Sequence, residues 1–356
     1  MATVPLDYDV LLLAPLALII GVTALWLLEL IFIDLDKRML GKLRHKHEAL
    51  ARFTNFTGVL FQALSHALGY TVTHSGVAHF QVSVHYGKVE PKREKQGVFA
   101  WTSTLLLYLG PFLVPTGFML LYSYFVLTKG FSFPASVQYT FVHTFENFGG
   151  TLSTFTQSMF RFLSSMDLLN PVHVFFLLVL LFLGLGIRPS YIGEERKEKV
   201  NFLYDLKNVT MHFIKKPLYI LVFFAVVYGF FFLSLALKTN WYVALFSVLG
   251  LLSVIGIIAL LLAFLLLAFV WASDKIAPGW RLVPFLTLPI SYGAVRVLFF
   301  YVPRDNILGW SLLVMILATV VVTLLLIKYK KTNRFKTAGP MKHMRVADGK
   351  KRASQK

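Results

Sequence analysis

The sequence predicts an all-α polytopic membrane protein with about seven transmembrane helices, one re-entrant helix and a short β-hairpin. Three observations support this fold class. Hydrophobic residues make up 57% of the chain and charged residues only 15%, with a mean hydropathy of +0.68. Seven apolar runs are long enough to cross a bilayer. Lys and Arg gather in alternate loops, as the positive-inside rule requires. A soluble domain would have no core large enough for 34 Phe.

The spans follow from length, because a transmembrane helix needs roughly 20 residues at a rise of about 1.5 Å each. The seven runs are residues 10–33, 98–127, 171–187, 218–237, 241–273, 282–302 and 307–327. Basic residues follow the first run where a removable signal peptide would have a small-residue cleavage site. We therefore interpret the first run as a retained signal anchor.

The distribution of Lys and Arg sets the orientation. Of the 35 basic residues, 30 fall in the segments that would lie inside. These segments are residues 34–52, 88–97, 188–217, 274–281 and 328–356. The positive-inside rule then places the N-terminus outside and the C-terminus in the cytoplasm, and we expect a multi-pass protein of a prokaryotic plasma membrane.

Residues 53–87 break the alternation of sides. With seven spans and the basic segments held inside, this stretch must leave the cytoplasmic side and return to it. We interpret it as a re-entrant element. Backbone that enters a membrane without crossing it persists only where protein or water satisfies its polar groups, so such an element indicates a buried site.

Two periods follow one another in this stretch. Small and polar residues first recur at steps of three and four, which places them on one helical face. They are Asn55, Gly58, Gln62, Ser65, His66, Gly69 and Thr73. After Gly76 the period becomes two, which predicts a strand with one polar face over residues 77–85.

A second amphipathic segment lies between the second and third spans. Its apolar residues repeat at steps of four and three, from Phe141 through Phe148 and Phe155 to Met166. We expect a helix or helix pair along the outer interface, bent where Gly149 and Gly150 adjoin. Packing is the simpler role for this stripe, and a mobile lid over the polar helix is the alternative.

The polar helix carries a run that invites comparison with zinc peptidases. Their His-Glu-x-x-His helix places two imidazoles on one face, and its Glu takes the proton from metal-bound water. The corresponding residues here are Gln62, Ala63, Leu64, Ser65 and His66. The second imidazole is present, whereas the first ligand and the base are not.

The order of motifs resembles intramembrane zinc metalloproteases of the site-2 protease class. The run QALSHALG from Gln62, a strand hairpin, the pair Gly110 and Pro111, and a later Asn170-Pro171 segment carry the resemblance. Arg188, Pro189 and Ser190 add to it. The resemblance implies a third ligand from a later helix, where Glu194, Glu195 and Asp205 are the nearby carboxylates. It also implies that the chain is a proteolytically inactive relative, because an alanine cannot act as a base.

Other readings of the same residues remain open. We expect no catalytic residue and no cofactor, and His66 alone is also consistent with a buried, hydrogen-bonded side chain in a tight bundle. The alternative is a zinc site, and the residues that could form it are His66, His74, His79, His85, Glu194 and Asp205. Arg296 is the basic residue inside a span, and either a functional role or snorkelling to the outer boundary fits it.

The net charge of +18 lies mostly on the inner side, where anionic lipids account for it. Residues 328–356 form a basic segment that we expect to be flexible and to bind inner-leaflet lipids. Binding of this tail to ribosomal RNA or another nucleic acid is the alternative. With no Cys, the chain has neither a disulfide framework nor a thiolate site.

These observations divide the chain into four parts. Residues 1–52 are the signal anchor and a basic loop, and residues 53–217 the protease-like core. Residues 218–327 are a C-terminal four-helix bundle, and residues 328–356 the tail. The expected function is a pseudoprotease that holds transmembrane segments or partner subunits in a groove lined by Gln62, Ser65, His66, Gly110 and Pro111. Its rivals are an active metalloprotease with unusual ligands, a transporter, and a structural subunit of a larger membrane complex.

Overall fold

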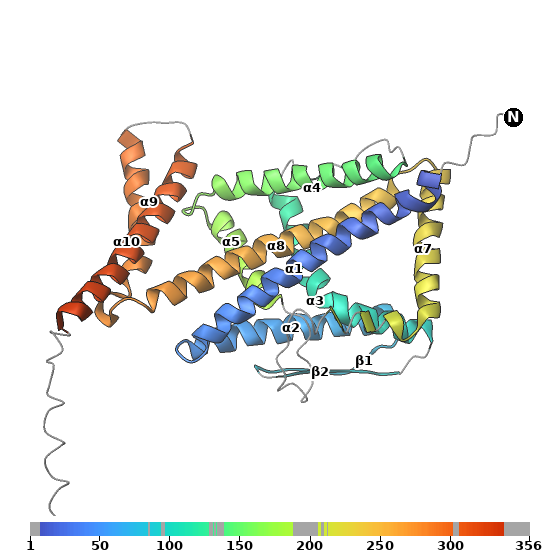
Figure 1. Ribbon diagram of the computed structural model, residues 1–356, viewed down its shortest axis with the longest axis horizontal. Helices are drawn as coiled ribbons and strands as arrows, with labels where there is room; N and C mark the ends of the chain where they lie inside the picture. Colours follow the sequence, from blue (N-terminus) through green and yellow to red (C-terminus); the bar gives the residue numbers. More distant parts are fainter. Residues whose placement is uncertain are drawn as a thin grey trace, which may run out of the picture. The chain divides into compact units, whose positions relative to one another are not determined.

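The chain folds into apolar helices and one β-hairpin (Figure 1), which makes it an all-α polytopic membrane protein. The computed structural model describes residues 8–84, 86–93, 97–127, 131, 133, 139–187, 206–207, 210–211, 213–301 and 306–337. The helices are α1 (Ala14–Leu43), α2 (Glu48–Val72), α3 (Val98–Val126), α4 (Phe141–Ser164), α5 (Pro171–Gly186), α7 (Pro217–Ala236), α8 (Trp241–Ser273), α9 (Val283–Tyr301) and α10 (Ile307–Thr337). The strands are β1 (Val77–Val82) and β2 (Gly87–Pro91).

All seven predicted apolar runs are helical. Six of these helices are long and apolar enough to cross a membrane. The seventh, α5, is apolar but has only 16 residues. Its sequence explains where it begins, because Pro171 occupies the first turn and the Asn170 side chain accepts a hydrogen bond from the Val172 N–H at 2.9 Å.

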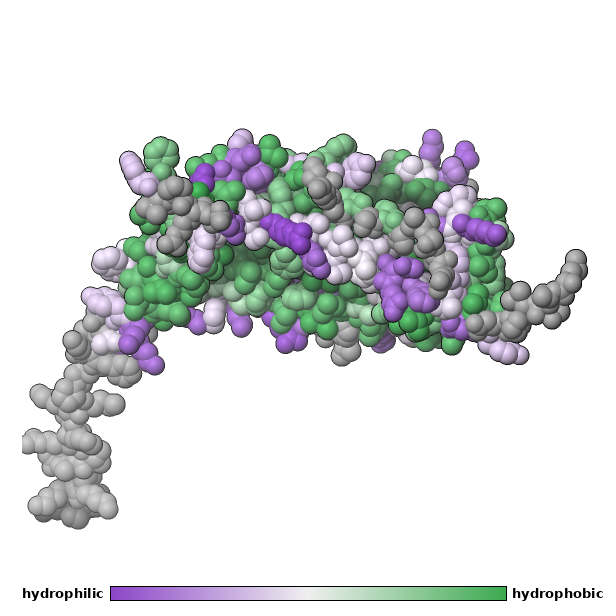
Figure 2. All heavy atoms as spheres, turned by 90° about the horizontal axis from the view of Figure 1, so that it is seen from above, coloured by the Kyte–Doolittle hydropathy of each residue, from purple (hydrophilic) through white to green (hydrophobic). Residues whose placement is uncertain are grey.

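Large apolar side chains are exposed over the outer faces of several helices. They are frequent on α7, α9 and α10, among them Leu221, Val297 and Leu324. Figure 2 shows apolar residues over much of the surface in that view. Exposed apolar area on this scale is typical of a protein that contacts lipid rather than water.

The chain divides into two compact units, Met1–Ala268 and Phe269–Lys356. In the first, α1, α4, α7 and the start of α8 share one apolar core, with Phe231 and Tyr242 fully buried in it. In the second, α9 packs on α10. This division differs from the predicted bundle of residues 218–327, because α7 and most of α8 pack with the N-terminal helices.

Helix α8 is the most enclosed of the candidate spans in the described chain. Of its most apolar window 61% is buried, against at most 39% in the others. Small residues let neighbouring helices approach it closely. Side chains of α4 reach Gly250, and Gly184 of α5 lies against Ala259 and Ala263. Phe148 of α4 fills the space beside both Gly250 and Gly21 of α1.

Helix α2 turns its small and polar face inward. Gly58, Gln62 and Ser65 are buried, whereas Phe56 and Leu64 on the other side are exposed. A helix in water has the opposite pattern, so this arrangement fits a helix at membrane depth. It begins at Glu48, five residues before the start of the predicted re-entrant element.

The hairpin lies along α2. β1 pairs with β2 in antiparallel register, with Phe80 opposite Val89. The Asn55 side chain of α2 donates a hydrogen bond to the Val84 carbonyl at 2.5 Å. The predicted strand over residues 77–85 therefore ends at Val82 in β1, and the turn after it leads into β2, which completes the predicted β-hairpin.

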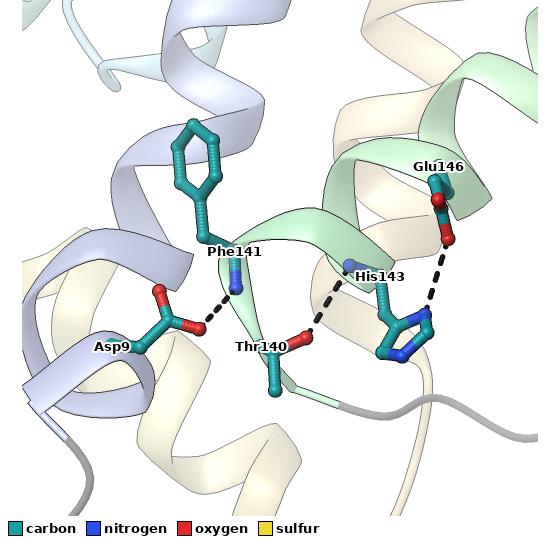
Figure 3. Close-up of polar contacts among 5 residues, drawn as sticks. All are labelled: Asp9, Thr140, Phe141, His143 and Glu146. Carbon is teal, nitrogen blue, oxygen red and sulfur yellow. Dashed lines mark hydrogen bonds and ion pairs between the residues drawn. The ribbon is translucent and has the colours of Figure 1, made fainter.

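Helix α4 is one continuous helix through Gly149 and Gly150, and not a helix pair. Two acceptors close its N-terminus (Figure 3): the Thr140 hydroxyl accepts from the His143 N–H at 3.3 Å, and the Asp9 carboxylate accepts from the Phe141 N–H at 2.9 Å. Phe148 and Phe155 of the predicted stripe are buried, as are two threonines, Thr144 and Thr151.

Helix α10 extends ten residues beyond the end predicted at residue 327. The Lys330 Nζ donates a hydrogen bond to the Ile276 carbonyl at 3.1 Å, which holds this extension within the second unit. The part of the predicted flexible tail up to Thr337 is therefore helical. The remainder, residues 338–356, lies outside the described residues.

Candidate functional site

The QALSHALG run lies where α2 meets α3. A Cβ atom built on Gly110 would lie only 2.7 Å from the Ser65 Cβ and 3.3 Å from its hydroxyl. The Ser65 hydroxyl is turned back along its own helix and donates to the Phe61 carbonyl at 2.7 Å. Helices approach this closely only where both present small residues, so the Ser65 and Gly110 pair fixes the crossing of α2 and α3.

Gln62 and Ala63 are enclosed at this crossing. Gln62 is 1% exposed, and its Nε2 has no hydrogen-bond partner among the described residues. Ala63 is fully buried, and a Cβ on Gly87 of the hairpin would lie 3.6 Å from the Ala63 Cβ. A buried amide donor without a partner costs free energy, so Gln62 is a polar group held in place by the surrounding fold.

The other predicted groove residues lie beside this contact. His66 is half-buried, with its ring 6.4 Å from the Tyr70 ring in an edge-on arrangement. Pro111 is buried inside α3, next to Gly110. Thus Gln62, Ser65, Gly110 and Pro111 are buried between helices, and His66 lies at the border of the contact.

Helix α5 forms the third wall. Its last residue, Gly186, lies against the Phe61 ring, and a Cβ built there would also be 3.2 Å from the Thr57 Cβ. The Phe61 and Phe182 rings meet at 5.4 Å between centroids. Near the start of α5, the Phe176 ring lies 5.6 Å from the Tyr122 ring of α3. The three helices that carry the predicted motifs therefore pack against one another.

The alternative metal ligands do not come together in the described chain. None of its His, Asp and Glu residues form a group of three that could hold a metal ion. His74 lies in the turn after α2, and His79 is exposed on β1, with its Nε2 3.5 Å from the Gln81 Oε1. The remaining candidates, His85, Glu194, Glu195 and Asp205, lie outside the described residues.

Arg296 lies on α9 in the second unit and is half-buried. α2 belongs to the first unit, so Arg296 is described apart from the QALSHALG run. It remains a candidate by its location in an apolar helix.

The structure reveals a further polar group that the sequence analysis passed over. Glu29 of α1 is 1% exposed, and its Oε1 has no hydrogen-bond partner among the residues that the structure describes. A Cβ on Gly256 of α8 would overlap this oxygen and would lie 3.4 Å from the Thr116 methyl of α3. Glu29 is the one acidic residue in the seven predicted spans, and that fact could have identified it.

Comparisons with known proteins identify no relative of this chain. No protein-family model, no curated protein and no solved structure matches this chain significantly. The chemistry of the site therefore rests on two places in the first unit, the α2–α3–α5 contact around Gln62 and the α1–α3–α8 contact around Glu29.

Proposed function

We propose that this protein is a catalytically inactive, site-2-protease-like membrane protein that binds transmembrane segments of partner proteins. The observation that carries the proposal is the inward polar face of α2. In the sequence, Gln62 and Ala63 stand where a zinc peptidase helix has its first ligand and its base, and Ser65 of the same run packs against Gly110 of α3. The three-helix contact with α5 supports the same architecture.

The two substituted positions support the proposal of an inactive relative. Ala63 has no atom that can take a proton from water, and the Gln62 amide is a poor substitute for an imidazole ligand. Zinc chemistry would also need deprotonated or neutral donors converging on one point. What remains is a helix that buries Gln62 and Ser65 together with the apolar Phe61 and Ala63. Its exposed side chains include the apolar Leu64 and Leu68, which suit binding.

The binding surface that we propose is the exposed side of α2 and the adjoining strand. Leu64 and Leu68, one turn apart on the same face of α2, are exposed there. On β1, the side chains of His79 and Phe80 are exposed. A partner helix would pack on the leucines, and an extended end of the same segment would pair with the free edge of β1.

Single-cysteine variants test this proposal, because the chain has no Cys of its own. The purified protein is reconstituted into vesicles with a dye at Leu64→Cys or Phe80→Cys, and a single-pass model peptide carries the acceptor dye. The control is Ile290→Cys, which is exposed on α9. We expect saturable energy transfer at the first two positions and only random-collision transfer at the control.

Two results would overturn the proposal. Equal transfer at all three positions would mean that α2 has no binding surface. Cleavage of the peptide that is sensitive to chelators and lost in His66→Ala would establish the active metalloprotease instead.

A further inference from the structure

The carboxyl group of Glu29 lies where three helices meet, away from the α2 site. Gly256 of α8 has no side chain, and the Glu29 carboxyl occupies the space where one would be. The Thr116 methyl group of α3 closes the same space, while the Thr116 hydroxyl donates to the Phe112 carbonyl at 2.5 Å. Trp26, one turn earlier on α1, also has a buried ring N–H without a hydrogen-bond partner in the described chain.

From this arrangement we propose that Glu29 is a proton-binding site within the membrane, whose neutral carboxyl holds α1 against α8 at Gly256. The ligand is a proton, and the bound form is the uncharged acid. The inference is independent of the pseudoprotease proposal, because none of its residues belongs to the α2 site.

The described helices provide no positive side chain beside the Glu29 carboxyl. Helices α3, α7 and α8 contain no Asp, Glu, Lys, Arg or His at all. On α4, the exposed His143 and Glu146 pair with each other, and Arg161 is also exposed. On α5, the His173 Nδ1 accepts from the Asp167 N–H. Burying an ionised carboxylate without a partner is far more costly than burying a neutral acid.

The ionisable groups of α1 and α2 are also occupied or distant. Asp34 pairs with Arg38 at 2.7 Å near the end of α1, and Lys37 is eight residues from Glu29, roughly 12 Å along the helix axis. On α2, Glu48 and Arg52 pair with each other at 2.6 Å, and His66 lies at the α3 border. Asp36, about two turns from Glu29, has buried carboxyl oxygens but as an acid supplies no positive charge. Among the residues that the structure describes, these positions leave a proton as the neutralising charge for Glu29.

The surroundings of the Glu29 carboxyl suit a proton better than a metal cation. A metal cation such as Mg²⁺ or Ca²⁺ takes six or more oxygen ligands. Beside Gly256 the Glu29 Oε1 occupies the position of a Cβ atom, and the next neighbour there is the Thr116 methyl group, which cannot ligate a cation. A protonated carboxyl needs only one acceptor for its O–H, and the buried backbone of α8 at Gly256, which no side chain covers, adjoins the carboxyl.

A space for water lies near Glu29 on α1. A small pocket with room for about one water molecule lies beside the same face of α1, lined by Ile33, Asp36 and Lys37 of α1, Thr54 of α2 and Leu267 of α8. Ile33 is one turn from Glu29 on that face. The pocket therefore brings a water-sized space to within about one turn of Glu29, and the carboxyl of Asp36 to within about two turns.

Infrared difference spectroscopy on the full-length protein in lipid bilayers tests the proposal directly. At neutral pH, the wild type minus Glu29→Gln spectrum should contain the carbonyl band of a neutral carboxyl, shifted in D₂O. The matched control is Glu48→Gln, an exposed glutamate, whose difference spectrum should contain carboxylate bands only. Carboxylate bands from Glu29 would overturn the proposal.

Stability provides the second measurement. Glutamine has the shape of the neutral acid, so Glu29→Gln should fold. The thermal unfolding midpoint of the wild type should fall as the pH is raised, because Glu29 then loses its proton on unfolding. The midpoint of Glu29→Gln should lack this fall. If Glu29→Gln fails to fold while Glu29→Asp folds, the native group is the charged form and the proposal is wrong. A pH dependence that is identical in wild type and Glu29→Gln would also overturn it.

Discussion

Ser65 and Gly110 touch across the α2–α3 crossing so closely that a methyl group on Gly110 would lie 2.7 Å from the Ser65 Cβ. No real Cβ atom tolerates that distance, so the glycine is a requirement of the crossing and not an incidental small residue. The contact holds Gln62 in its buried position, since both residues lie on the same face of α2.

Gly110→Ala is therefore expected to destabilise the protein by about 1 to 3 kcal/mol, because the added methyl group overpacks the crossing. The matched control is Gly117→Ala on the same helix, where nothing lies within 4 Å of the built Cβ. Thermal unfolding in one detergent compares the two. Combining Gly110→Ala with Ser65→Gly should recover part of the loss, and equal midpoints for Gly110→Ala and Gly117→Ala would contradict the contact.

Restoring the two residues of the zinc helix should have unequal effects. Gln62→His adds an imidazole one turn from His66 and is expected to give measurable zinc binding that disappears in Gln62→His/His66→Ala. Ala63→Glu places a carboxylate at a fully buried position under the hairpin, and we expect a loss of about 3 to 5 kcal/mol. Zinc titration and unfolding measure both. Stoichiometric zinc in the wild type would contradict this prediction.

The hairpin should depend on pH through one exposed ion pair. The Lys88 ammonium donates to the Glu90 carboxylate at 2.7 Å, and this hydrogen bond and charge lower the pKa of Glu90 and raise the pKa of Lys88. The stabilisation is present between the ordinary values of the two groups. It is lost as the pH falls through the lowered pKa of Glu90 or rises through the raised pKa of Lys88.

Hydrogen exchange of the β1 and β2 amides checks this expectation. Lys88→Gln should give the acidic-pH level of protection at neutral pH, and salt should weaken the wild-type effect because the pair is exposed. Lys92→Gln, at the end of the same hairpin, is the control and should change nothing. A Lys88→Gln profile that matches the wild type at every pH would mean that the pair is energetically silent.

The predicted sidedness can be tested on described residues. Lys92→Cys follows β2 and should react with an impermeant maleimide only in inside-out vesicles. Lys238→Cys, in the turn after α7, should react from the outside. If Lys92→Cys is labelled from the outside, α2 crosses the membrane and the re-entrant assignment fails.

The sequence by itself determined the helices and the inward side of α2. Apolar runs of membrane length form helices because backbone N–H and C=O groups in lipid must form hydrogen bonds within their own segment. Whether such a run is helical therefore depends little on the segments that pack against it. The spacing of Gly58, Gln62 and Ser65 likewise predicts one face, and the structure buries that face. The sequence also grouped Ser65 with Gly110, since both residues belong to the motifs that carry the resemblance.

Only the tertiary structure decided which helices meet. Gly256 and Glu29 lie 227 positions apart in the sequence, and no local period connects them. This contact forms because Gly256 has no side chain and leaves room for the carboxyl of a distant segment, and that complementarity belongs to the packed helices rather than to either segment alone.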